Sequence, residues 1–223
     1  DYEETEMLRD SLEISERGIR TGIELIQPGI TELEVAAEVE RTMRKAGSKR
    51  TAFDTVIASG PRSGEKLASA RQKKIDADEL VVINVSAIHG EYYSDVARTI
   101  YTGKPGEKHK KFFELTRKAL SKTLEQIIPG TTSGEIEGSM RRYLRTLSVG
   151  ETTIDISAYG VGLELYEYPR IFQDEVHLIK PGMVICAKAG SSICEVGGLR
   201  LGETILVTDD NKELLNKLPV DTI

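Results

Sequence analysis

The chain contains no tryptophan, and aromatic residues make up only 5% of its 223 residues. A hydrophobic core must therefore be built from Val, Ile, Leu and Ala. No apolar run approaches the roughly 20 residues that a membrane-spanning helix needs, so we expect no membrane partner. The opening residues, DYEETEMLRD, are acidic and lack the apolar stretch of a secretory signal, so no targeting segment is expected.

The chain also lacks a surplus of basic residues and has only two cysteines. The net charge is −6, whereas nucleic-acid-binding domains usually carry a basic surplus, so nucleic acid is disfavoured as a partner. Cys186 and Cys194 have no other Cys or His near them in the sequence and do not form a metal motif. We therefore expect a soluble, cytoplasmic protein whose cysteines act as small apolar residues.

The clearest feature present is an internal repeat. Residues 25–44 and 126–145 both read as a Pro-Gly turn followed by an amphipathic helix, at an offset of 129 − 28 = 101 residues. Thr31 with Glu34, and Thr132 with Glu135, each have the spacing of a helix capping box. The repeat predicts one domain over residues 1–223, made of two halves at about 1–103 and 104–223.

Each half also shows the pattern of helices followed by strands. Apolar residues recur at helical spacing over 3–26 and 107–127, whereas LVVINVSAI (80–88) is a continuous β-branched run typical of a buried strand. A second strand is predicted to follow the turn at 89–91, and 183–190 with 198–209 give a matching pair. The fold class is therefore α/β (α+β), with helices packed on antiparallel strands and a site expected between the halves.

Several motifs carry a resemblance to a known family. FDTVIASGP (53–61), SDVARTIYTG (94–103), YGVGLELYEYP (159–169), KPGMVICAKAG (180–190) and GLRLGETILVT (198–208) resemble the pita-bread family, in particular its Xaa-Pro dipeptidase and aminopeptidase P branch. The similarity covers essentially the whole chain and implies the pita-bread fold. Full-length members of that branch carry a separate N-terminal domain, so we expect a short member or an excised catalytic domain.

The resemblance implies a dinuclear metal site, but this sequence has other residue types at most of the positions that hold the metal ligands in the family. In the family two Asp, one His and two Glu hold two divalent ions, and these positions fall on Asn84, Asp95, Tyr159, Lys188 and Gly202. Only Asp95 keeps its ligand type. The family's proton-handling histidines fall on Leu67 and Tyr166, and the three histidines present, His89, His109 and His177, are interpreted as plain surface residues.

The charge of this set is unsuited to metal. The family's ligands carry −4, whereas the residues here sum to −1 + 1 = 0, because an ammonium stands where a carboxylate is expected. Two divalent cations need several anionic ligands to offset their charge. We therefore expect no cofactor and no catalytic residue, and we hypothesise that Lys188 forms a buried ion pair with Asp95.

Three functions compete at this point. The favoured one is a catalytically inactive, metal-free relative, a pseudoenzyme that binds a peptide, a small polar ligand or a protein and that could form a homodimer. The second is a metal-independent hydrolase of C–N bonds, like creatinase, with Lys188 and Tyr159 as an acid–base pair. The third is an Xaa-Pro metallopeptidase with an atypical site. The ligand-binding cleft, a relic of the metal site, is predicted to comprise Leu67, Asn84, Asp95, Tyr159, Tyr166, Lys188, Arg200, Gly202 and Glu203.

Overall fold

The computed structural model describes residues 2–66, 68–147, 152–171 and 176–220. Its first half holds two helices, a short 3-10 helix and five strands. In chain order these are α1 (Tyr2–Leu25), α2 (Glu32–Lys45), β1 (Val56–Ser59), η1 (Gly60–Gly64), β2 (Leu80–Val85), β3 (Ile88–His89), β4 (Tyr92–Tyr93) and β5 (Val96–Tyr101).

The second half repeats this order with longer strands. Its elements are α3 (Glu107–Gln126), α4 (Ser133–Thr146), β6 (Thr152–Gly160), β7 (Glu167–Arg170), β8 (Val184–Ile193), β9 (Gly197–Val207) and β10 (Lys212–Leu214). The starts of α2 and α4 differ by 133 − 32 = 101 residues, which is the offset of the sequence repeat. No helix in the described ranges is long and apolar enough to cross a membrane.

The repeated helices begin at the predicted caps. The Thr31 hydroxyl accepts a hydrogen bond from the Glu34 amide at 3.1 Å, and the Glu34 carboxylate accepts one from the Thr31 amide at 2.8 Å. Thr132 and Glu135 make the same pair of bonds at 3.3 and 2.8 Å. Two otherwise unpaired amides are thus satisfied at each helix start, and both capping boxes are confirmed.

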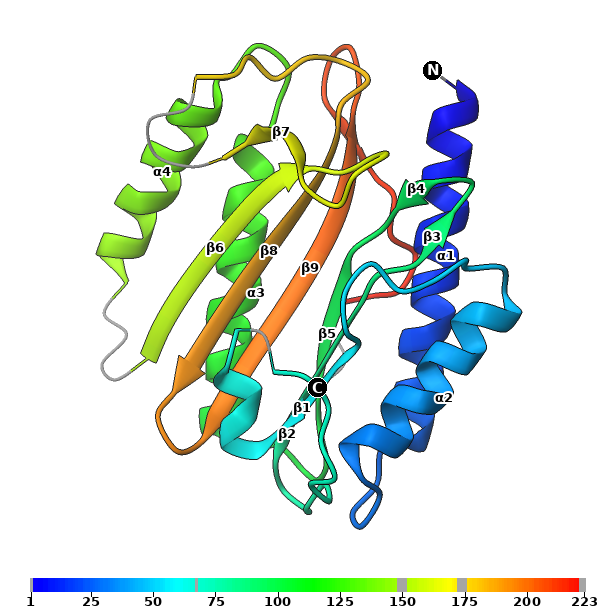
Figure 1. Ribbon diagram of the computed structural model, residues 1–223. Helices are drawn as coiled ribbons and strands as arrows, with labels where there is room; N and C mark the ends of the chain where they lie inside the picture. The colour runs from blue at the N-terminus through cyan, green and yellow to red at the C-terminus, as the bar shows by residue number, and fades with distance from the viewer. Residues whose placement is uncertain (1, 67, 148–151, 172–175, 221–223) are drawn as a thin grey trace.

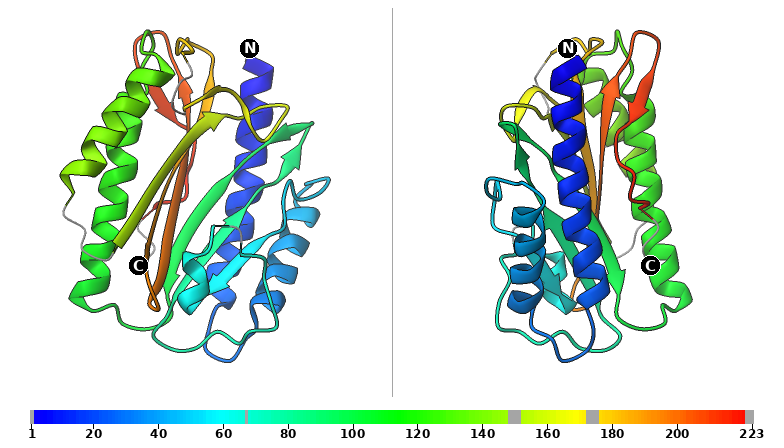
Figure 2. Two further views of the ribbon diagram at one scale, coloured as in Figure 1. Left: turned by 60° about the vertical axis from the view of Figure 1, so that its left-hand side comes forward. Right: turned by 90° about the vertical axis from the view of Figure 1, so that its right-hand side faces the viewer.

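The strands form two main antiparallel sheets, each covered by its own helices. The first has the order β1-β2-β5 and the second β10-β9-β8-β6-β7. Figures 1 and 2 show α1 and α2 beside the shorter sheet and α3 beside the longer one, with α4 outside α3. Separate hydrophobic clusters fill the two helix–sheet layers, one centred on Ile19, Val39 and Ile83, the other on Leu120 and Ile185. The predicted α/β class with helices on antiparallel strands is confirmed.

The second predicted strand of the first half is interrupted. A small hairpin of β3 and β4 turns at Gly90 and Glu91, both with positive φ, and β5 begins only at Val96. Between them the Ser94 side chain is fully buried and lies within hydrogen-bond distance of Ser11 and Ser15 on α1, at 3.1 and 2.9 Å. This polar contact fixes the chain beside Asp95 against α1.

We predict that the two capping boxes contribute equally to stability. Thr31→Ala and Thr132→Ala should each lower the unfolding free energy by about 1 kcal/mol and the melting temperature by roughly 2–4 °C. Effects should add in the double variant, because the sites are far apart in separate halves. Thr→Ser at either position keeps the hydroxyl and should stay near wild type in thermal unfolding. A Ser variant as unstable as the Ala variant would contradict the capping explanation.

Candidate functional site

Asp95 lies at the centre of a buried polar cluster between the two halves. Its side chain is fully buried, directly before the first residue of β5. Oδ1 accepts a hydrogen bond from Asn84 Nδ2 at 2.8 Å and forms an ion pair with Lys188 Nζ at 2.5 Å, and Oδ2 accepts a hydrogen bond from the Tyr159 hydroxyl at 2.6 Å. Side chains from β2, β8 and β6 thus converge on one carboxylate. Its negative charge is paired with the Lys188 ammonium, and its oxygens also accept hydrogen bonds from two neutral groups.

Lys188 reaches this carboxylate from β8, across β9. It stands opposite Gly202 in the β8–β9 register, and a Cβ at position 202 would lie only 3.2 Å from Lys188 Cγ. Because residue 202 has no side chain, there is space for the Lys188 side chain to pass over β9 and reach Asp95. Lys188 Nζ also donates to Asn84 Oδ1 at 3.0 Å and lies 5.8 Å from the centre of the Phe53 ring. The hypothesised Lys188–Asp95 ion pair is confirmed.

The neutral members of the cluster hold their protons firmly. Burial, together with the nearby Cys186 and Asp95, raises the pKa of the Tyr159 phenol far above its usual value, so the hydroxyl serves as a donor. Burial, and secondarily the charge of Asp95, raises the pKa of the Cys186 thiol to about 12. The Cys186 sulfur lies 3.5 Å from the backbone oxygen of Asp95, within reach of a weak hydrogen bond. Neither group can supply or take a proton near neutral pH.

Two further residues of the predicted cleft, Tyr166 and Arg200, lie at different places in the structure. Tyr166 packs edge-on against Tyr159, with ring centroids 4.5 Å apart, and is 47% exposed at the surface. The Arg200 guanidinium donates to the backbone oxygens of Lys66 at 2.6 Å and Glu65 at 3.3 Å, so it anchors the loop after η1. Leu67 lies outside the described residues.

Glu203, expected to line the cleft, is paired with a residue that sequence reasoning missed. Adjacent residues of a strand point to opposite faces of the sheet, and since Gly202 faces Lys188, Glu203 is directed to the other face. There its Oε1 accepts from Arg98 Nη2 at 3.2 Å, and Arg98 is completely buried. The alternation along β5 that places Asp95 on one face could have assigned Arg98 to the other.

The Arg98–Glu203 pair is less well satisfied than the Lys188–Asp95 pair. Arg98 also donates to the backbone oxygens of Gly202 at 2.6 Å and Pro219 at 2.9 Å, whereas Glu203 Oε2 is buried without a hydrogen-bond partner. Burial raises the pKa of the Glu203 carboxyl to about 7; Arg98 acts to lower it, and the nearby Glu16 carboxylate raises it further. Glu203 therefore titrates near neutral pH inside the fold.

The histidines lie apart from the cluster. His109 stacks on Tyr101 and His177 on Tyr168, each with ring centroids 4.6 Å apart, and His89 Nδ1 lies 3.4 Å from the Gly47 oxygen. Over residues 2–66, 68–147, 152–171 and 176–220, no group of three or more His, Cys, Asp and Glu is placed to hold a metal ion.

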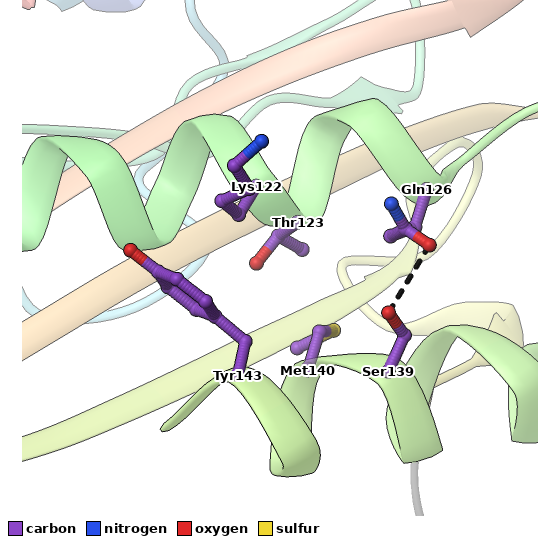
Figure 3. Close-up of a pocket in the computed structure, with 6 residues that line it drawn as sticks. All are labelled: Lys122, Thr123, Gln126, Ser139, Met140 and Tyr143. Atoms are coloured by element: carbon purple, nitrogen blue, oxygen red, sulfur yellow. Dashed lines mark hydrogen bonds between the residues drawn. The ribbon is translucent and has the colours of Figure 1, made fainter. Parts of the chain in front are cut away.

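Surface cavities occur away from the cluster. One of about 160 Å³ lies between α3 and α4, and Figure 3 shows Gln126 bonded to Ser139 at its edge, at 3.1 Å. Its lining residues are Lys122, Thr123, Gln126, Ser139, Met140 and Tyr143. None of these residues belongs to the predicted cleft. We therefore keep the polar cluster around Asp95, which contains the predicted cleft residues Asn84, Tyr159 and Lys188, as the candidate site.

We predict a pH dependence of stability that comes from Glu203. Its pKa in the fold is raised from 4.5 to about 7, so the folded state binds more protons than the unfolded state between these values. Stability is therefore lost as pH rises from about 4.5 to about 7. Glu203→Gln should remove the part of the slope that this carboxyl contributes between pH 4.5 and about 7. Glu213→Gln, which removes an exposed carboxylate, should keep the wild-type slope. An unchanged slope in Glu203→Gln would contradict the assignment.

Comparison with known proteins finds Xaa-Pro dipeptidases among the relatives of the chain. The chain is 38% identical to the Xaa-Pro dipeptidase of Pyrococcus furiosus over 215 residues, and 37% identical to that of Pyrococcus horikoshii over 214 residues. These alignments cover 96% of this chain but only 62% and 61% of the relatives, so the chain spans less than two thirds of their length.

Solved structures give the same result for the fold. The prolidase from Pyrococcus furiosus matches with a TM-score of 0.92 at 37% identity, covering 98% of this chain and 65% of that one. The X-Pro aminopeptidase from Thermotoga maritima matches with a TM-score of 0.92 at 30% identity, covering 99% and 63%. The expected pita-bread fold of the Xaa-Pro dipeptidase branch is thereby confirmed. Because the family described as Metallopeptidase family M24 matches residues 6–209, the chain belongs to that family.

Proposed function

We propose that this Xaa-Pro dipeptidase-like M24 domain binds a peptide or protein segment and does not hydrolyse peptide bonds by a dinuclear metal mechanism. The observation that carries this proposal is the position of Lys188 Nζ, 2.5 Å from Asp95 Oδ1. A cation that belongs to the protein occupies the surroundings of the one carboxylate in the cluster.

The donor set does not fit two divalent metal ions. Of the five positions that the resemblance assigns to ligands, Asn84, Asp95, Tyr159 and Lys188 contact one another, and Gly202 lies directly beside Lys188. Their charges sum to −1 + 1 = 0. Dinuclear hydrolytic centres need several anionic oxygens to offset four positive charges, and a neutral set with one carboxylate does not meet that need.

Two groups of the cluster, Tyr159 and Cys186, are also unsuited to acid–base catalysis of metal-free hydrolysis. A general acid or base works best when its pKa lies near the working pH. The pKa of Tyr159 is raised far above that range and the Cys186 pKa to about 12. Glu203 titrates near neutral pH, but it lies on the opposite face of β9 with Arg98. These observations favour binding over the creatinase-like alternative.

The accessible part of the site is its aromatic rim. Asp95 and Tyr159 are buried, whereas Tyr166 is 47% exposed and Tyr168 61% exposed, with Leu163 beside them in the sequence. Tyrosine is enriched at the centres of protein interfaces because it gives a large contact area with few rotatable bonds. We therefore assign ligand contact to Tyr166, whose ring packs on Tyr159 of the cluster, and to its exposed neighbour Tyr168.

A second candidate function is Xaa-Pro dipeptidase activity. It is favoured by the names of the two relatives at 37–38% identity, both of which are Xaa-Pro dipeptidases. This activity would require metal ions to displace Lys188 from Asp95 or to use ligands outside the described residues. The two candidates therefore differ in metal content as well as in activity.

Metal loading and peptide cleavage distinguish the two functions. We expect the protein, after incubation with excess Mn²⁺ or Co²⁺ and dialysis, to retain no stoichiometric metal and to leave Xaa-Pro dipeptides uncleaved. The Pyrococcus furiosus Xaa-Pro dipeptidase, treated identically, is the positive control. Two retained metal equivalents together with cleavage would establish the dipeptidase function and remove the proposal.

Binding is tested separately, by thermal shift with a panel of Pro-containing peptides. A peptide that raises the melting temperature of the wild type, but not that of Tyr166→Ala/Tyr168→Ala, would support the aromatic rim as the binding surface. Equal shifts in both proteins would place the ligand elsewhere.

A further inference from the structure

The two halves meet at a junction that lacks a backbone ladder. Among the strand pairs of the described residues, β5 pairs with β2 and β9 pairs with β8 and β10, but β5 and β9 are not paired with each other. Instead the Thr99 hydroxyl accepts from the Arg200 amide at 2.8 Å and lies 3.0 Å from the Arg200 oxygen. Arg98 donates to the Gly202 oxygen. Side chains, rather than a continuous sheet, close this junction.

Lys188 crosses the same junction from the second half. Its backbone lies in β8, and its ammonium passes over Gly202 in β9 to reach Asp95 at 2.5 Å and Asn84 Oδ1 at 3.0 Å in the first half. Only 12% of its side chain is exposed. It is thus the positive charge that compensates Asp95, whereas Asn84 and Tyr159 supply neutral donors to that carboxylate.

We propose that the Lys188 ammonium is a resident structural cation, which joins the two halves through Asp95 and excludes metal ions from the site. The inference rests on the proposed function in one respect, that no metal shares the site with the lysine. In this role one side chain both neutralises the buried carboxylate and fills the space beside it.

The charge balance makes this role measurable. If Lys188 alone is removed, Asp95 remains buried with neutral donors only, and an uncompensated buried charge is strongly destabilising. If both charges are removed by groups of similar shape, the desolvation cost disappears along with the attraction, and the net effect is small. A structural cation therefore predicts a large coupling between the two positions.

A double-mutant cycle in thermal unfolding tests this coupling. Lys188→Met should lower the melting temperature by about 10 °C, and Asp95→Asn should lower it too, because it leaves the ammonium unpaired. The double variant Lys188→Met/Asp95→Asn should return to within about 3 °C of wild type. If Lys188→Met does not fold, recovery of folding in the double variant supports the same conclusion.

Lys49→Met is the matched control, because Lys49 pairs with Glu91 at the surface, where both side chains are more than 60% exposed. That variant should melt within about 2 °C of wild type. A Lys188→Met variant as stable as this control, or a double variant less stable than both singles, would overturn the proposed role.

Charge reversal at the same position tests the exclusion of metal. Lys188→Glu places a second carboxylate beside Asp95 and the Asn84 side-chain oxygen, a set of hard oxygen donors suited to Mn²⁺. We expect this variant to melt below Lys188→Met without metal, to gain about 5 °C or more with Mn²⁺, and to retain one equivalent after dialysis. The wild type and Lys188→Met should retain none.

The two proposals fail in different ways. Retention of Mn²⁺ by the wild type together with dipeptide cleavage would remove the proposed function, and the resident cation with it. Absence of Mn²⁺ from Lys188→Glu, or equal Mn²⁺ shifts in Lys188→Glu and Lys188→Met, would overturn the exclusion of metal by Lys188 and leave the proposed function standing.

Discussion

The arrangement of the site depends on one buried charge pair, Lys188 with Asp95. A carboxylate with no access to water must be neutralised and hydrogen-bonded, or it destabilises the fold. Three neighbouring residues serve this single requirement. Asn84 bonds both charged groups, Tyr159 satisfies the second carboxylate oxygen, and Gly202 leaves room for the lysine. The set is consistent as a group, because each member either contacts the ion pair or leaves space for it.

A second buried pair lies on the opposite face of the same strands, and the two differ in how completely they are satisfied. Both oxygens of Asp95 have donors, whereas one oxygen of Glu203 has none in the described structure. Most hydrogen bonds of the Arg98 guanidinium go to backbone oxygens, so Arg98 offsets the negative charge of Glu203 only in part. Opposite environments within a few strands thus give one carboxylate in close contact with an ammonium and one carboxyl whose pKa burial raises to about 7.

Local signals in the sequence were sufficient for much of the fold. The capping boxes at Thr31 and Thr132 and the 101-residue repeat predicted the helix starts correctly, because caps depend on neighbouring residues only. The Lys188–Asp95 contact was predicted through the family resemblance, since charge alone does not place residues 93 positions apart side by side.

The role of Glu203 was not predictable in the same way. Its placement depends on strand register, because a shift by one residue moves a side chain to the other face of the sheet. The Arg98 partnership further requires knowing that the C-terminal segment folds back over β5, as its bonds to Leu218 and Pro219 show. The separation of β4 from β5 also depends on distant contacts, those of Ser94 with α1.

The return of the C-terminal segment has a consequence for the order in which the protein can mature on the ribosome. Arg98 bonds the backbone of residues 218 and 219, and Glu16 of α1 accepts from the Lys217 amide at 2.8 Å. Both charged groups belong to the half that is synthesised first, yet their partners are among the last residues described. The interior of the first half therefore keeps two incompletely bonded charged groups until residues 217–219 have been synthesised and have folded back, so its native packing depends on a segment of the second half.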